Sequence, residues 1–127
     1  MARFLTQEWL DGTREIAASQ PARPGVTARV QLLITAGPDG DVKHAVVLED
    51  GVLVSADVGT VPDPDVTVTA PYAAWREVVS GDRDLSVAFM QGVVKVAGDT
   101  GSFLRLLPIT RTPEFHRLQQ QIRAATD

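Results

Sequence analysis

The stretch FMQGVVKVAGDTG, from Phe89 to Gly101, changes its structural character twice within thirteen residues. Its first apolar residues end a short predicted helix, and Gln91-Gly92 interrupts that helix. The segment VVKVA is typical of a strand, and GDTG supplies Asp99 as the N-cap of another helix. A lone glutamine and a glycine therefore stand between two strongly apolar segments. What this pair does depends on how the rest of the chain surrounds those segments.

Further helices are predicted on both sides of this stretch from capping residues and apolar periodicity. Each starts at a residue that favours an N-cap or a first-turn position, and the first two are followed by glycine or proline, which end helices. The start signals are Thr6, Pro71, Asp84, Asp99 and Thr112-Pro113, and the first two helices end by Ser19 and at Gly81.

Five strands are predicted from alternating or continuous apolar patterns. The first, from Val26 to Thr35, alternates apolar and polar residues as a half-buried strand does. The others are Val42–Leu48, Val52–Val58, Val66–Ala70 and Val93–Ala97, with a tight hairpin signal at Glu49–Gly51. Short turns between the first four strands predict an antiparallel meander, because parallel neighbours need long crossovers. The predicted fold class is α+β, a five-stranded, largely antiparallel sheet covered on one face by helices.

Length and composition restrict the class of protein. A chain of 127 residues, 44% of them hydrophobic, has the usual size and composition of one globular domain, so we predict a single domain over residues 1–127. A formal charge of −4 gives no support for a nucleic-acid or anionic-membrane partner. The absence of cysteine excludes a disulfide framework, a thiol nucleophile and a thiolate metal site. No apolar run approaches the roughly 18 residues that span a bilayer. No signal peptide is recognisable, so we predict a cytoplasmic protein without stable membrane insertion.

Enzyme motifs are absent from the sequence. The ordinary interpretation of both histidines, His44 and His116, is a solvated or core-edge side chain. The carboxylates of PDGD (38–41) and PDPD (62–65) occur where aspartate favours turns. No GxSxG elbow, GxGxxG loop or Walker loop is present. We therefore predict no catalytic residue, no metal and no cofactor, and a protein that is not an enzyme.

The segment SFLRLLPI, from Ser102 to Ile109, is apolar around most of a helix circumference. An ordinary surface helix offers only one apolar stripe, so this helix must be covered on several sides. The cover is either the C-terminal helix, or a second copy of the chain in a homodimer, or an internal cavity that holds an apolar ligand.

Four parts follow one another in a specific order and spacing between Asp65 and Leu107. They are the DVTVT strand (Asp65–Thr69), Trp75 in a helix that ends near Gly81, the run AFMQGVVKVAGD (Ala88–Asp99), and the leucine-rich helix (Phe103–Leu107). This segment resembles the second half of the sterol carrier protein (type two) lipid-binding domain family. Val93 and Thr100 depart from the lysine and methionine that are frequent in that family. The chain ends in ATD rather than in a peroxisomal targeting tripeptide, so it is most similar to a stand-alone bacterial-type member.

The resemblance implies an apolar tunnel between the sheet and its helices. It also implies non-catalytic binding and transfer of a hydrophobic small molecule, such as a fatty acid, an acyl-CoA or a sterol-like lipid. In the family the glutamine of the Gln-Gly pair faces the tunnel, so Gln91 is expected to hold the polar end of the ligand, while Gly92 lets the chain turn into the next strand. The predicted ligand-binding residues are Gln91, Trp75, Val79, Phe89, Met90, Phe103, Leu104, Leu107, Leu32 and Ile34.

Two alternatives stay open at this point. An accessory enzyme or cyclase would use the same pocket to orient a hydrophobic metabolite without a catalytic triad. Its acid, base or hydrogen-bonding candidates are His44, Asp57, Tyr72 and Gln91. A homodimeric interaction module would instead cover the apolar helix with a second copy of the chain.

Overall fold

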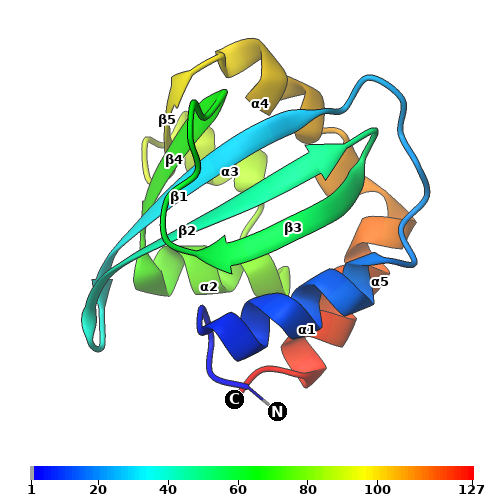
Figure 1. Ribbon diagram of the computed structural model, residues 1–127. Helices are drawn as coiled ribbons and strands as arrows, with labels where there is room; N and C mark the ends of the chain where they lie inside the picture. Colours follow the sequence, from blue (N-terminus) through cyan, green and yellow to red (C-terminus); the bar gives the residue numbers. More distant parts are fainter. Residues whose placement is uncertain (1) are drawn as a thin grey trace.

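The computed structural model describes residues 2–127 (Figure 1). Helices and strands follow one another closely along the chain. The elements are α1 (Gln7–Ala17), β1 (Ala28–Gly37), β2 (Gly40–Glu49), β3 (Val52–Val58), β4 (Val66–Pro71), α2 (Tyr72–Ser80), α3 (Leu85–Met90), β5 (Lys95–Gly98), α4 (Thr100–Leu106), a 3-10 turn η1 (Ile109–Arg111) and α5 (Pro113–Ala124).

The helices begin where the capping residues predict. Four predicted N-cap side chains each accept a hydrogen bond from the backbone N–H three residues later. These caps are Thr6 for α1, Asp84 for α3, Asp99 for α4 and Thr112 for α5. Helix α2 instead follows Pro71 and ends at Gly81, which has the left-handed backbone (φ 87°) of a helix C-cap.

The five strands form one sheet in the order β3-β2-β1-β4-β5. Three of the four pairings are antiparallel, which confirms the predicted α+β class, but β4 pairs with β1 in parallel. The predicted four-stranded meander is therefore wrong at its last strand. The hairpin of β2 and β3 occupies the long connection that a parallel pair requires, so β4 can lie on the other side of β1.

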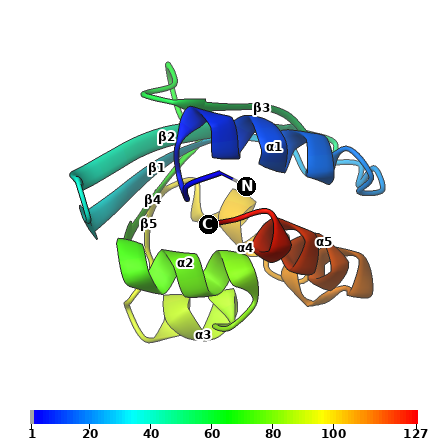
Figure 2. The same ribbon diagram turned by 90° about the horizontal axis from the view of Figure 1, so that it is seen from below.

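The loop from β3 to β4, residues 59–65, crosses the face of the sheet away from α1 and α2 (Figure 2). Gln31 on β1 holds this loop. Its side-chain Nε2 donates to the carbonyl oxygens of Gly59 (3.0 Å) and His44 (3.1 Å), and its Oε1 accepts from the N–H of Val61 (2.9 Å). Only 6% of Gln31 is exposed. The alternating pattern had placed this residue on a polar face, and the crossing loop buries it.

The other face of the sheet is covered by helices (Figure 2). Helix α1 packs on β3, α2 packs on β1 and β4, and α5 lies against both helices. The two ends of the chain meet beside them, where the indole Nε1–H of Trp9 donates to Thr126 Oγ1 at 2.8 Å. The helices thus enclose the inner face of the sheet, and the candidate site lies in this space.

Candidate functional site

A cavity of about 380 Å³ lies between the inner face of the sheet and helices α1, α2, α4 and α5, with Leu85 as the one contribution of α3. Its size is within the range of small-molecule sites, about 300 to 1,000 Å³. The wall is mainly apolar, as such sites require. Its apolar side chains include Trp9 and Leu10 from α1, Val30, Leu32, Val46, Leu48, Leu53, Val66 and Val68 from the sheet, Trp75, Val78 and Val79 from α2, Phe103 and Leu106 from α4, and Phe115, Leu118 and Ile122 from α5.

The structure brings four of the ten predicted ligand-binding residues together in this wall. They are Leu32, Trp75, Val79 and Phe103. Periodicity predicted them correctly as inward positions of β1, α2 and α4. Their contact with a ligand stays a prediction.

The other apolar residues of the prediction do not line the cavity. Ile34 is fully buried (0% exposed) in the core beyond it, and Phe89 and Leu107 pack half-buried against that core. Met90 is 83% exposed, and Leu104 is 49% exposed. The reason for Met90 is that α3 buries only Ala88 fully, and Met90 is its last residue. Leu104 stands on the solvent side of α4 beside the exposed Arg105, whereas Phe103 and Leu106 line the cavity.

Gln91 lies at the C-cap of α3, is exposed, and does not line the cavity. Its backbone N–H is bonded to the carbonyl of Val87, and its side chain has no place in the cavity wall. Gly92 has the left-handed backbone that the turn into the next strand requires (φ 77°). The Gln-Gly pair of the opening stretch is thus a helix terminator in this structure.

His44 is the most buried polar side chain of the cavity wall. It lies on β2 directly between Leu32 of β1 and Val58 of β3, and only 3% of it is exposed. Its Nδ1 is buried without a hydrogen-bond partner among residues 2–127. Burial lowers the pKa of His44 from 6.5 to about 4, so the ring is neutral at pH 7.

The inward orientation of His44 can be predicted from the alternation pattern of its strand, although no motif indicates it. His44 alternates with Val42, Val46 and Leu48, which are inward residues of β2, whereas Lys43 takes the opposite face. A histidine at an apolar position of a strand pattern points into the core side of a sheet. Among the predictions from the sequence, His44 stands only as a solvated or core-edge histidine and as a candidate of the accessory-enzyme alternative, and not among the ligand-binding residues of the carrier.

Most other polar residues of the cavity wall stand at its rim, where they are exposed or half-buried. Arg83 pairs with Glu77 at 3.3 Å, and Asp84 pairs with Arg111 at 3.3 Å. These partly exposed pairs leave the rim charged and wet, in contrast to the apolar interior. The rim residues are Thr13, Arg23, Arg83, Asp84, Thr110 and His116, whereas the remaining polar residue of the wall, Gln119, is buried.

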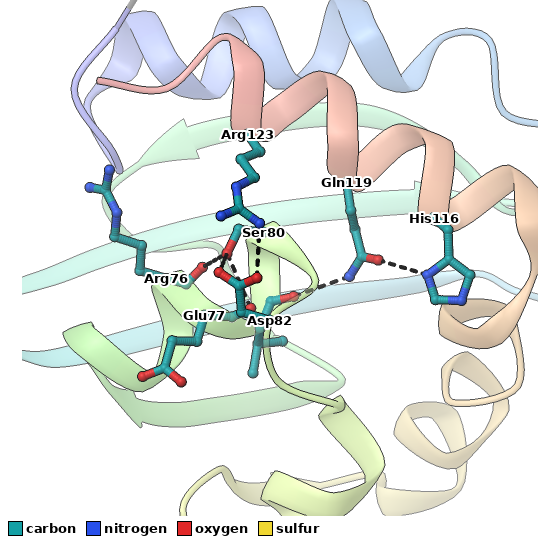
Figure 3. A network of polar contacts seen from close by, with 8 residues as sticks. Arg76, Glu77, Ser80, Asp82, His116, Gln119 and Arg123 are labelled. Atoms are coloured by element: carbon teal, nitrogen blue, oxygen red, sulfur yellow. Dashed lines mark hydrogen bonds and ion pairs between the residues drawn. The ribbon is translucent and has the colours of Figure 1, made fainter.

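Gln119 closes the cavity between α2 and α5 (Figure 3). Its Nε2 donates to the backbone carbonyl of Val78 at 3.1 Å, and its Oε1 lies 3.2 Å from His116 Nδ1. A second link joins the same helices nearer solvent, where Arg123 Nη1 donates to Asp82 Oδ1 at 2.8 Å. The buried bond of Gln119 fixes the end of α2 against α5 and so defines one wall of the cavity.

Replacing Gln119 by alanine is expected to lower the free energy of unfolding by about 1 kcal/mol, because the carbonyl of Val78 loses one of its two donors and keeps only the N–H of Gly81. Urea denaturation measures this change. Gln120→Ala is the matched control, since Gln120 is an exposed neighbour on the same helix. Equal stability of the two variants would contradict the role given to Gln119.

Of the four acid, base or hydrogen-bonding candidates, only His44 reaches the cavity. Asp57 is exposed on β3 and bonded to Gln7 and Ser55, and Tyr72 packs edge-on against Phe4 outside the cavity. Within residues 2–127 no cluster of three or more histidine, cysteine or acidic side chains is arranged to hold a metal ion. No helix in this same range has the length and apolarity needed to cross a membrane.

A model of the SCP-2 sterol transfer family matches residues 10–110 of the chain. The chain belongs to the SCP-2 sterol transfer family. The match includes Asp65–Leu107, the segment that carried the resemblance, and extends over β1, β2 and β3 as well. No curated protein matches this family member significantly in sequence.

Solved structures share the fold of this SCP-2 family member. A crystal structure of sterol carrier protein 2 has a TM-score of 0.69 at 19% identity, over 95% of this chain and 98% of that one. The solution structure of palmitated SCP2L2 from Aedes aegypti has a TM-score of 0.67 at 21% sequence identity, over 84% of this chain and 95% of that one. The solution structure of a conserved hypothetical protein from Thermus thermophilus has a TM-score of 0.63 at 18% identity, over 94% of this chain and 90% of that one. At these identities the likeness concerns the fold.

Proposed function

We propose that this chain is a non-catalytic carrier that binds a hydrophobic small molecule, such as a fatty acid, an acyl-CoA or a sterol-like lipid, in the cavity behind the sheet. The observation that carries the proposal is the cavity itself, about 380 Å³ of space walled by apolar side chains from four strands and five α-helices. Membership of the SCP-2 sterol transfer family supports it. The structure of a palmitated relative with the same fold agrees with it.

The energetics of an apolar wall are sufficient for such binding. Each methylene removed from water contributes about 0.8 kcal/mol before ordering costs. A long acyl chain therefore needs few polar contacts for useful affinity. The charged rim suits a ligand of which one end stays in water.

We also propose that the protein acts in the cytoplasm.

The apolar circumference of α4 does not favour the homodimer. Phe103 is 2% exposed, and Leu106 and Leu107 are half-buried within the same chain. Only Leu104 of this helix remains widely exposed among its leucines. The sheet and the cavity therefore lie against the apolar sides of α4, whose cover the sequence did not determine.

Two tryptophan variants of α4 test the proposal. Leu106 lines the cavity, whereas Leu104, two residues away on the same helix, faces solvent. We expect Leu106→Trp to fill the cavity and weaken binding of a fluorescent fatty acid at least about tenfold, since overpacking the site excludes the ligand. Leu104→Trp is the matched control and should bind as the wild type does.

Native mass spectrometry of the purified proteins gives the second readout. The wild type and Leu104→Trp should carry an extractable adduct of lipid mass, and Leu106→Trp should lose it. Equal binding by both variants would place the ligand outside the cavity. Wild-type protein without an adduct that also rejects the fluorescent fatty acid would contradict the carrier function.

A further inference from the structure

Three polar side chains of the described residues are buried, and two of them have partners. Gln31 holds the loop across the outer face of the sheet, and Gln119 is bonded to the carbonyl of Val78. His44 differs because its Nδ1 is buried without a partner among residues 2–127. Gln31 lies on a strand but outside the cavity, and Gln119 lines the cavity from a helix. His44 combines the two features, since it lies on β2 and lines the cavity.

Buried polar groups in folded proteins are nearly always hydrogen-bonded, because an unpaired one loses its bond to water without replacement. The side chains next to His44 in the sheet, Leu32 and Val58, cannot supply a partner. His44 lines the cavity, so a ligand bound there lies against its ring. Protein atoms cover Nδ1, so the ring has to turn before a ligand atom pairs with this nitrogen.

The chemistry of the ring restricts what that atom can be. Burial lowers the pKa of His44 to about 4, so at neutral pH the imidazole has one donor nitrogen and one acceptor nitrogen. A hydroxyl group can both donate and accept, so it can pair with either nitrogen. A carboxylate at this depth would place a charge among apolar side chains, which is costly. The charged rim, with Arg23 and Arg83, is the better place for it.

We propose that His44 is the anchor for a hydroxyl group at the buried end of the ligand. The cavity then selects a hydrophobic molecule that carries a hydroxyl remote from its charged or solvated end. This inference rests on the proposed carrier function and names the ligand class within it. It replaces Gln91 by His44 as the polar contact of the site.

The test compares 16-hydroxyhexadecanoate with hexadecanoate as competitors of a bound fluorescent fatty acid. When the carboxylate of either acid lies at the rim, the far end of the chain lies in the interior. There the hydroxyl of 16-hydroxyhexadecanoate can pair with His44, and the methyl group of hexadecanoate cannot. The measured quantity is the affinity for 16-hydroxyhexadecanoate divided by the affinity for hexadecanoate. We expect this ratio to fall about tenfold when His44 is replaced by leucine. Lys43→Leu is the matched control, because Lys43 is the exposed neighbour on the opposite face of β2, and it should leave the ratio unchanged.

A nuclear magnetic resonance measurement on the unsubstituted protein serves as the second test. The ring ¹⁵N resonances of His44 should shift with 16-hydroxyhexadecanoate and move much less with hexadecanoate. An unchanged affinity ratio in His44→Leu, or ring resonances that respond alike to both acids, would overturn the anchor while leaving the carrier function intact. If neither acid binds the wild type, the carrier function itself fails, and the anchor fails with it.

Discussion

Lowering the pH from 7 to 4 is expected to reduce the free energy of unfolding by about 3 kcal/mol through His44 alone. The pKa of this histidine is about 4 in the folded protein and 6.5 as its ordinary value, which applies to the unfolded chain. Each pH unit between these two values costs about 1.4 kcal/mol. Burial in the cavity wall causes the difference, because the charged imidazolium loses its hydration there.

The sign follows from which state binds the proton. Between pH 6.5 and pH 4 the unfolded chain takes up a proton at His44 and the folded protein does not, so acid favours unfolding. Above pH 6.5 both states are neutral at this position, and the full stability is present. Below pH 4 both are protonated, and this contribution changes no further.

The substitution His44→Leu should remove this part of the acid dependence. It should also raise stability at pH 7 by about 1–3 kcal/mol, since it eliminates a buried nitrogen without a partner. The titratable and charged residues that line the same cavity remain in both proteins, so the difference between the two pH profiles isolates His44; they are Arg23, Arg83, Asp84 and His116. Urea denaturation at several pH values measures both profiles. Parallel profiles for wild type and variant would show that His44 is not buried as a neutral ring.

The second large effect is expected at Gln31. Replacing it by alanine removes three hydrogen bonds, from the amide to the backbone of Gly59, His44 and Val61. We expect a loss of about 2–4 kcal/mol in the free energy of unfolding, because the backbone groups of the crossing loop lose buried partners. Hydrogen exchange should rise most at the N–H of Val61, which donates to Gln31.

Thr67→Ala is the control for this prediction. Thr67 stands directly opposite Gln31 on β4, half-buried on the same face of the sheet. Its loss should change stability by no more than about 0.5–1 kcal/mol, as for an ordinary strand position. A Gln31→Ala variant as stable as Thr67→Ala would mean that the loop holds its course without the glutamine.

Capping residues and alternation were enough to predict most of the secondary structure, because these signals act within a few residues of the chain. Thr6, Asp84, Asp99 and Thr112 cap the helices through the backbone immediately after them, and their identity suffices. The strand pattern likewise showed that Leu32 points inward. The family was recognised from the Asp65–Leu107 segment, and the family match confirms it.

Two features depend on the tertiary structure alone, namely which strand pairs with β1 in parallel and which polar side chain lines the cavity. A loop of turn-forming residues is compatible with a hairpin or with a crossing of the sheet. In the structure this loop crosses the sheet and is hydrogen-bonded to Gln31, which is far from it in sequence, and β4 pairs with β1. The sequence predicted Gln91 as the polar residue of the site, whereas the structure places His44 in the cavity wall and Gln91 outside it, for a similar reason. Gln91 follows the last residue of α3, and only the first residue of this helix, Leu85, lines the cavity. His44, in contrast, belongs to a strand whose inner face the helices cover. Burial depends on what packs over a residue, and distant segments of the chain supply that cover.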